Sequence, residues 1–296
     1  MLKLGTTLFS EKETDFVSAV KSAAKAGFKY VDFDLTHDYG ETFSAEEKEL
    51  KRRLNILKDN GLTVSQAHSP FIVISKDPND FMGEKFSESV KKSIRLSAII
   101  GAPYLVQHLY VPYKINCESV PYVYSDMSED NFKRNVEFCQ KLKPILKENG
   151  VIMALENLAA YDWVGRCHAS TVCCTSKECN SYINALGDKN FCICLDAGHL
   201  NLLAGEGFDE FISALNGRVK VLHLHDNFGI LNDWFGELDR HLPPFVGCLE
   251  WGKLAAALKK NGFDGVYSFE VKGYAPIEFI DTEYKYIYDA GCKIFG

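Results

Sequence analysis

The sequence predicts a (β/α)8 TIM barrel, and three regularities along the chain support this fold class. A short β-rich run recurs at intervals of roughly 35 residues, as expected when one βα unit is repeated. An amphipathic stretch with helical periodicity separates successive runs. Eight such units fit into 296 residues, which is the size of a single barrel of this class. We therefore expect one domain that spans residues 1–296.

Eight segments have the composition of buried strands, because they are rich in β-branched and aromatic residues. The predicted strands are residues 3–9, 28–35, 62–68, 103–109, 151–157, 191–197, 219–225 and 265–271. Helical stretches alternate with these segments, and that alternation favours parallel pairing within one sheet.

Two of the intervening stretches show the helical pattern clearly. Phe16, Val20 and Ala23 recur on one face between residues 14 and 27, and leucines recur in the same way within residues 46–61. Glycine lies one to three residues before five of the strands, at positions 27, 61, 101, 150 and 262. A glycine is expected there because a helix C-terminus favours a left-handed residue.

The longest interruptions of this rhythm are residues 110–128, 158–174 and 226–249, and each follows a predicted strand. In a barrel these loops lie at the C-terminal face, where active sites are built. Segments of low complexity are absent from the sequence, so we expect one domain with long loops at this face.

Composition excludes several classes of protein. The net charge of −7 weighs against a nucleic-acid partner, because phosphate binding requires clustered Lys and Arg. No apolar run approaches the ~20 residues that span a bilayer, and the N-terminal segment turns acidic too soon for a signal peptide. We expect a cytoplasmic protein whose ten cysteines are free and mostly buried, because C-x-x-C pairs are absent from the sequence.

Polar residues with metal-binding chemistry occur where the predicted strands end. They are His68, His108, Glu156, Asn157, Asp196, His199, His223, His225 and Glu270, and the loop after the seventh strand adds Asp239 and His241. His223 and His225 are two residues apart in a strand, so their side chains leave from the same face. Six of the chain's eight histidines are thus expected at one rim, beside four carboxylates.

Each of these residues taken alone has an ordinary structural interpretation. Asp196 could cap the following helix, and residues 239–241 could form an exposed turn. The group as a whole favours a metal site, because buried carboxylates are costly without a cation. Imidazole and carboxylate ligands without thiolate are typical of Mn, Zn, Fe or Mg. Signatures of nucleotide-binding loops and of a serine nucleophile elbow are absent from the sequence.

Four motifs are similar to those of the xylose-isomerase-like superfamily of barrels, which includes sugar isomerases, epimerases and the endonuclease IV family. They are ALEN (154–157), LDAGH (195–199), HLHDN (223–227) and SFEV (268–271), and the resemblance covers essentially the whole chain. It implies one tightly bound divalent metal, held by Glu156, Asp196, His223 and Glu270. The resemblance leaves the identity of the metal open among Mn, Zn, Mg, Fe and Co, and it allows up to three ions.

The resemblance also implies roles in catalysis. In the epimerase branch two metal-bound glutamates act as acid and base, and here these roles fall to Glu156 and Glu270. We expect His225, Asn157 and Trp163 to contact the substrate or the metal ligands. A metal is needed because a C–H beside a carbonyl is too weakly acidic without polarisation of the oxygen.

The endonuclease IV branch provides the alternative function, because its members hold three metals. The sequence has a candidate for each additional ligand, namely His68, His108, His199, Asp239 and His241. A multi-metal phosphoester hydrolase of the endonuclease IV type therefore stays open, since clustered metals stabilise both the attacking and the leaving oxygen. In the sugar-acting branch His199 would contact a substrate oxygen, and the other four would be substrate contacts or hydrogen-bonded rim residues.

The sequence departs from the nuclease pattern in two places. The segment HLPPFVGCLEW (241–251) lacks the G-E-G turn that follows D-x-H in the nucleases, and residues 35–44 and 110–128 are not basic. We therefore predict a metal-dependent sugar or sugar-phosphate isomerase or epimerase that acts on a small carbohydrate and has neither a nucleic-acid nor a membrane partner. The sequence leaves a homo-oligomer open, and the intact glutamates disfavour a non-catalytic metal-binding barrel.

Overall fold

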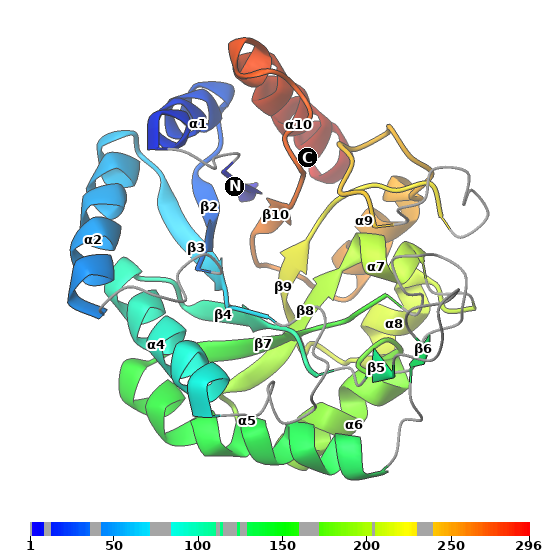
Figure 1. Cartoon of the computed structure of the whole chain (residues 1–296). Helices are drawn as coiled ribbons and strands as arrows, with labels where there is room; N and C mark the ends of the chain where they lie inside the picture. The colour runs from blue at the N-terminus through cyan, green and yellow to red at the C-terminus, as the bar shows by residue number, and fades with distance from the viewer. Residues whose placement is uncertain are drawn as a thin grey trace.

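The computed structural model describes residues 2–8, 13–35, 43–71, 84–110, 113–114, 123–124, 129–159, 172–202, 205–229 and 239–296. Within these ranges, eight parallel strands form one sheet that curls into a barrel, and helices surround it (Figure 1). The strand order is β10-β1-β2-β3-β4-β7-β8-β9. The predicted (β/α)8 TIM barrel is therefore confirmed.

The eight barrel strands coincide with the eight predicted segments. They are β1 (Leu4–Thr7), β2 (Tyr30–Asp34), β3 (Thr63–His68), β4 (Tyr104–Gln107), β7 (Ile152–Glu156), β8 (Phe191–Asp196), β9 (Val219–His223) and β10 (Tyr267–Phe269). Each strand is shorter than its predicted run, because composition does not mark the residue at which a ladder of hydrogen bonds begins or ends.

The barrel closes between its last two strands. An isolated parallel bridge joins Leu224 to Phe269, beyond the end of β9. The backbone amide of Leu224 donates to the carbonyl of Ser268 at 2.9 Å, and the amide of Glu270 donates to the carbonyl of Leu224 at 3.0 Å. This closure fixes the backbone of Glu270 beside that of β9.

Helices form the outer layer of the barrel. They are α1 (Glu13–Ala26), α2 (Phe43–Asp59), α4 (Glu84–Ile100), α5 (Glu129–Asn149), α6 (Ser176–Leu186), α7 (Ala197–Asn201), α8 (Phe208–Ala214), α9 (Trp251–Lys260) and α10 (Ile280–Phe295), with a short 3-10 helix η2 (Ile277–Phe279) before α10. Phe16, Val20 and Ala23 of α1 are buried, as the helical pattern predicted. The glycines that were expected at helix ends have positive φ, for example +76° at Gly101.

One small element was not predicted. Strands β5 (Tyr113–Lys114) and β6 (Val123–Tyr124) pair antiparallel within the loop that follows β4. Two residues per strand are too few for the alternation of apolar and polar residues that identifies a strand in a sequence. The hairpin therefore could not be separated from the surrounding loop.

The interior of the barrel has an apolar layer below the strand ends. It consists of Val106, Ala154, Cys192, Cys194 and Val221. Because side chains alternate across a strand, the next interior positions lie two residues further along, at the C-terminal mouth of the barrel. On β4, β7, β8 and β9 those positions are His108, Glu156, Asp196 and His223.

Two further expectations concern cysteines and membranes. The cysteines that the structure describes are free, and Cys139, Cys173, Cys174, Cys179, Cys192 and Cys194 among them are buried. A search of the described helices finds none whose length and apolarity would suffice to cross a bilayer.

Candidate metal centre

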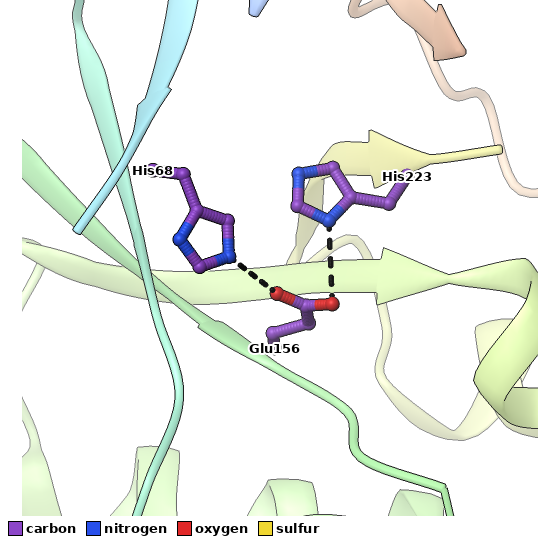
Figure 2. Close-up of side chains that lie close together, drawn as sticks. All are labelled: His68, Glu156 and His223. Carbon is purple, nitrogen blue, oxygen red and sulfur yellow. Dashed lines mark hydrogen bonds and ion pairs between the residues drawn. The ribbon is translucent and has the colours of Figure 1, made fainter. Parts of the chain in front are cut away.

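Glu156 lies at the centre of the polar cluster in the barrel mouth, and its two carboxylate oxygens face different histidines. Oε2 is 3.3 Å from Nε2 of His68 and 2.9 Å from Nε2 of His108. Oε1 is 3.3 Å from Nδ1 of His223 and 3.4 Å from Nδ1 of His199. Figure 2 shows the carboxylate between His68 and His223, with one oxygen turned toward each ring. This side chain is therefore shared between two groups of nitrogen donors.

The four residues that the resemblance implies as ligands converge on one position. Nδ1 of His223 lies 3.0 Å from Oε2 of Glu270, 3.3 Å from Oε1 of Glu156 and 3.9 Å from Oδ2 of Asp196. One ligand atom from each of the four lies within 4.8 Å of the others. The four residues come from the ends of β7, β8 and β9 and from just beyond β10, so closure of the barrel is what assembles them.

A second group of donors lies beside the first and shares Asp196 with it. Oδ2 of Asp239 is 3.4 Å from Nε2 of His199 and 3.1 Å from Nε2 of His241. The ring of His225 stacks on His241 with a centroid distance of 3.9 Å, and its Nε2 is 3.0 Å from Oδ2 of Asp196. The five residues that could hold additional metals or contact substrate, His68, His108, His199, Asp239 and His241, thus all surround the four-ligand position.

Backbone carbonyls orient three of these histidines. Nδ1 of His68 lies 2.8 Å from the carbonyl of Ser69, Nδ1 of His199 lies 2.8 Å from that of Asn157, and Nδ1 of His241 lies 2.9 Å from that of Glu270. A carbonyl only accepts hydrogen bonds, so each Nδ1 donates a proton to it. In the neutral ring Nε2 then has a free lone pair, which is what a metal requires.

Burial and neighbouring charges shift the pKa values of the histidines in different directions. Burial alone would lower the pKa of His68, but the hydrogen bond and the charge of Glu156 raise it to about 9. Burial would likewise lower the pKa of His241, but the charge of Asp239 contributes to raising it to about 10. At His108 burial prevails over the attraction of Glu156 and lowers the pKa.

The same interactions keep the carboxylates ionised. Burial would raise the pKa of Glu156, but the charges of His108 and His223 hold it well below its usual range. Glu270 behaves in the same way, because His223 outweighs burial and lowers the pKa of this carboxyl group. In the metal-free protein, protonated histidines therefore provide the positive charge that buried carboxylates need.

Several buried atoms of the cluster have no hydrogen-bond partner, and this tests whether the residues fit a divalent metal. Both ring nitrogens of His223, Oε2 of Glu270 and Oδ1 of Asp239 are buried without one. Leaving such atoms unsatisfied is costly. A divalent cation would satisfy His223 Nδ1 and Glu270 Oε2 together, and an imidazole–carboxylate donor set is one that such cations take. The residues present therefore fit the metal.

Two polar residues near the cluster are occupied by structural hydrogen bonds. The side chain of Asn157 accepts from the amide of Asp196 at 2.7 Å and donates to its carbonyl at 3.0 Å, so it joins the ends of β7 and β8. Asp226 accepts from the amides of Asn227 and Leu249 at 2.9 Å each. One oxygen of Asp196 similarly caps α7 through the amide of His199 at 2.6 Å, as its sequence position allowed.

One predicted residue and two unpredicted ones complete the description of the centre. Trp163, which we expected to contact substrate or ligands, lies outside the described residues. Asp32 on β2 and Gln66 on β3 were not singled out, yet both are buried, and Asp32 lies 3.0 Å from His223. Their signal in the sequence was an acidic and an amide side chain at interior positions of otherwise apolar strands.

The protein is a parallel (β/α)8 barrel whose mouth is lined with imidazole and carboxylate groups. The chain matches the family model described as xylose isomerase-like TIM barrel over residues 20–290, and it belongs to that family. A curated relative, the uncharacterized protein y4fM of Sinorhizobium fredii, is 22% identical over 280 residues, which cover 83% of this chain and 78% of that protein.

Solved structures of similar fold include two sugar epimerases. The structure of an L-ribulose 3-epimerase has a TM-score of 0.73 at 16% identity and covers 100% of this chain and 95% of that chain. A D-allulose 3-epimerase from Methylomonas sp. also has a TM-score of 0.73 at 16% identity, with 99% of this chain and 98% of that chain covered. At this identity the likeness establishes the fold.

Proposed function

We propose that this chain is a divalent-metal-dependent isomerase or epimerase that acts on a sugar or sugar phosphate. The observation that carries this proposal is the position of Glu156 and Glu270. Both carboxylates approach the same nitrogen, Nδ1 of His223, at 3.3 Å and 3.0 Å, so both flank one position at the barrel mouth. Two bases around one substrate-binding position are what inversion of a carbon beside a carbonyl requires.

The chemistry divides between the metal and the two glutamates. A bound divalent metal would polarise the substrate carbonyl and make the neighbouring C–H more acidic. One of the two glutamates takes the proton from that carbon, and the other returns a proton from the opposite face. Because the pKa values of Glu156 and Glu270 lie below their usual range, either carboxylate is ionised and can accept that proton. The glutamate that returns a proton to the opposite face must first take one from solvent. His199 and His225 lie beside Asp196 at this position and would donate to a substrate oxygen.

The comparisons support the carbohydrate part of the proposal. The family is xylose isomerase-like, and structures of an L-ribulose 3-epimerase and a D-allulose 3-epimerase align with nearly the whole chain. We propose a small carbohydrate as substrate, with one tightly bound metal.

A second candidate is a multi-metal phosphoester hydrolase, and one observation favours it. Glu156 would be able to bridge two metals, because its Oε2 faces His68 and His108 while its Oε1 faces His223. Together with the second group around Asp239, the cluster contains enough donors for more than one metal. Clustered metals would stabilise the attacking and leaving oxygens of a phosphoester.

A metal count combined with two assays separates the candidates. Protein purified without chelator is analysed for metal by mass spectrometry and then assayed for epimerisation of ketoses, free and phosphorylated, and for nicking of abasic duplex DNA. We expect one metal per chain, epimerisation and no nicking. If the protein holds three metals per chain and nicks DNA, and His68→Ala eliminates the nicking, the hydrolase replaces the isomerase. If it holds three metals and releases phosphate from small esters, it is a hydrolase of small molecules.

A further inference from the structure

A buried carboxylate below the metal-binding position has no assigned role. Asp32 lies at the centre of β2, and its side chain is only 4% exposed. Oδ2 of Asp32 is 3.0 Å from Nε2 of His223, which comes from β9 on another part of the barrel wall. A buried carboxylate is costly unless donors or a cation surround it, so this contact needs an explanation.

Gln66 fixes the position of Asp32. Its Nε2 donates to Oδ2 of Asp32 at 2.7 Å and also lies 3.3 Å from the carbonyl of Leu222. The glutamine therefore connects β3 to β2 and to β9 inside the barrel, and its amide orientation is determined because both partners accept. A carboxylate accepts but does not donate when it is ionised, so the nitrogen of His223 that faces Asp32 must carry the proton.

His223 is oriented in the opposite way to the other histidines of the cluster. His68, His199 and His241 turn Nδ1 toward a backbone carbonyl and Nε2 toward the cluster. His223 turns Nδ1 toward Glu156, and Figure 2 shows its other nitrogen pointing away from that carboxylate. Among the residues that the structure describes, its buried Nε2 has no partner in hydrogen-bond geometry, although Asp32 is 3.0 Å away. A small rotation of the ring would complete that bond.

We propose that Asp32, held by Gln66, is a positioning residue that selects the protonation form and the direction of His223. With the proton fixed on Nε2 by Asp32, Nδ1 presents its lone pair to the position between Glu156 and Glu270. Carboxylates in this relation to a metal-binding histidine increase its basicity and hold its ring in place. This inference rests on the proposed metal site and extends it to β2 and β3.

Cobalt affinity tests the proposal without using any substrate. Co²⁺ is titrated into the metal-free protein, and its visible absorption reports how many ligands bind it. Asp32→Asn keeps the shape of the side chain and removes its charge, and we expect Co²⁺ to bind about 10- to 100-fold more weakly. The matched control is Ser65→Ala, because Ser65 also bonds across β2 and β3, through the carbonyl of Val31, without contacting Asp32. This control should bind Co²⁺ as the wild type does.

Nitrogen NMR of histidine distinguishes positioning from a general defect. In the zinc-loaded protein, labelled at histidine nitrogens and assigned with His223→Gln, we expect His223 to be protonated at Nε2. In Asp32→Asn the proton on Nε2 should exchange faster with water, because a charged acceptor holds it more strongly than a neutral one. Thermal unfolding of the metal-free variants should stay near that of the wild type.

The outcomes separate this inference from the proposed function. If the wild type binds Co²⁺ and Asp32→Asn binds it equally tightly, the positioning role is wrong while the metal site stands. Protonation of His223 at Nδ1 in the zinc-loaded protein would also overturn it. If the wild type does not bind Co²⁺ at all, the proposed metal site fails and this inference fails with it.

Discussion

The two levels of the barrel interior differ in chemistry although the same strands build both. On β4, β7, β8 and β9 the lower level is apolar and includes Val106, Ala154, Cys194 and Val221. Two residues further along the same strands, the mouth carries His108, Glu156, Asp196 and His223. The lower level can be satisfied by packing alone, whereas the mouth contains buried atoms without hydrogen-bond partners. On these four strands the packed apolar layer and the polar mouth are thus about 7 Å apart.

The largest effect is expected from removing one carboxylate at the mouth. Glu156→Gln removes a charge and the proton acceptor while it nearly preserves the shape of the side chain. We expect turnover of the substrate to fall about 10²- to 10⁴-fold, the range for loss of a general base. Metal content should also fall, because an amide is a weaker ligand than a carboxylate. Wild-type turnover in this variant would contradict the assignment of Glu156.

The two histidines of the HLHDN motif should differ in their effect on the metal. His223→Ala should empty the site, since Nδ1 of His223 lies 3.3 Å from a carboxylate oxygen of Glu156 and 3.0 Å from one of Glu270. His225→Ala should retain the metal and reduce turnover, since Nε2 of His225 faces Asp196 at 3.0 Å. Metal analysis after gel filtration measures both. If His225→Ala empties the site and His223→Ala does not, the two roles are exchanged.

A substitution in the lower level should reduce stability and leave metal binding unchanged, in contrast to substitutions at the mouth. Val221 is 1% exposed and lies two residues before His223 on β9. Val221→Ala should decrease the free energy of unfolding by about 0.5–3 kcal/mol, because it removes buried methyl groups. Metal affinity should be unchanged, and urea unfolding together with Co²⁺ titration would measure the two quantities. A loss of metal without a loss of stability would mean that the two levels are not separate.

The smallest effect concerns pH and the metal-free protein. The pKa of His68 is raised from 6.5 to about 9, so the stability that its protonated form contributes is fully present below pH 6.5 and is lost by about pH 9. We expect the urea midpoint of chelated protein to fall between pH 6.5 and about pH 9. The midpoint of metal-loaded protein should fall less, because the metal replaces the proton as the positive charge. His68→Gln should reduce the slope, and an unchanged slope would contradict this role of His68.

The sequence predicted the fold because the information it needs is local. The β-rich composition of the strands, the helical periodicity between them and glycines such as Gly101 at helix ends are each visible within short segments. The rim residues followed from the same reasoning, because the C-terminal ends of parallel strands meet at one end of a barrel. His68, Glu156 and Glu270 could therefore be grouped without coordinates.

The contacts that depend on closure of the barrel could not be predicted. Asp32 and His223 lie on β2 and β9, and no local pattern states that their side chains meet inside the barrel. The role of Asn157 was also hidden, because its amide bonds to the backbone of Asp196 and not to another side chain. A hydrogen bond to a backbone group cannot be inferred from the residue types in a sequence.

Exchange of a substrate proton with solvent tests the central claim directly. Metal-loaded protein is incubated in D₂O with a panel of ketoses, free and phosphorylated, and proton NMR follows the C–H beside the carbonyl. We expect one ketose to exchange that proton for deuterium with the wild type and not with Glu156→Gln or with chelated protein. Absence of exchange across the panel, together with hydrolysis of a phosphoester by the same metal-loaded protein, would contradict the isomerase and establish the alternative.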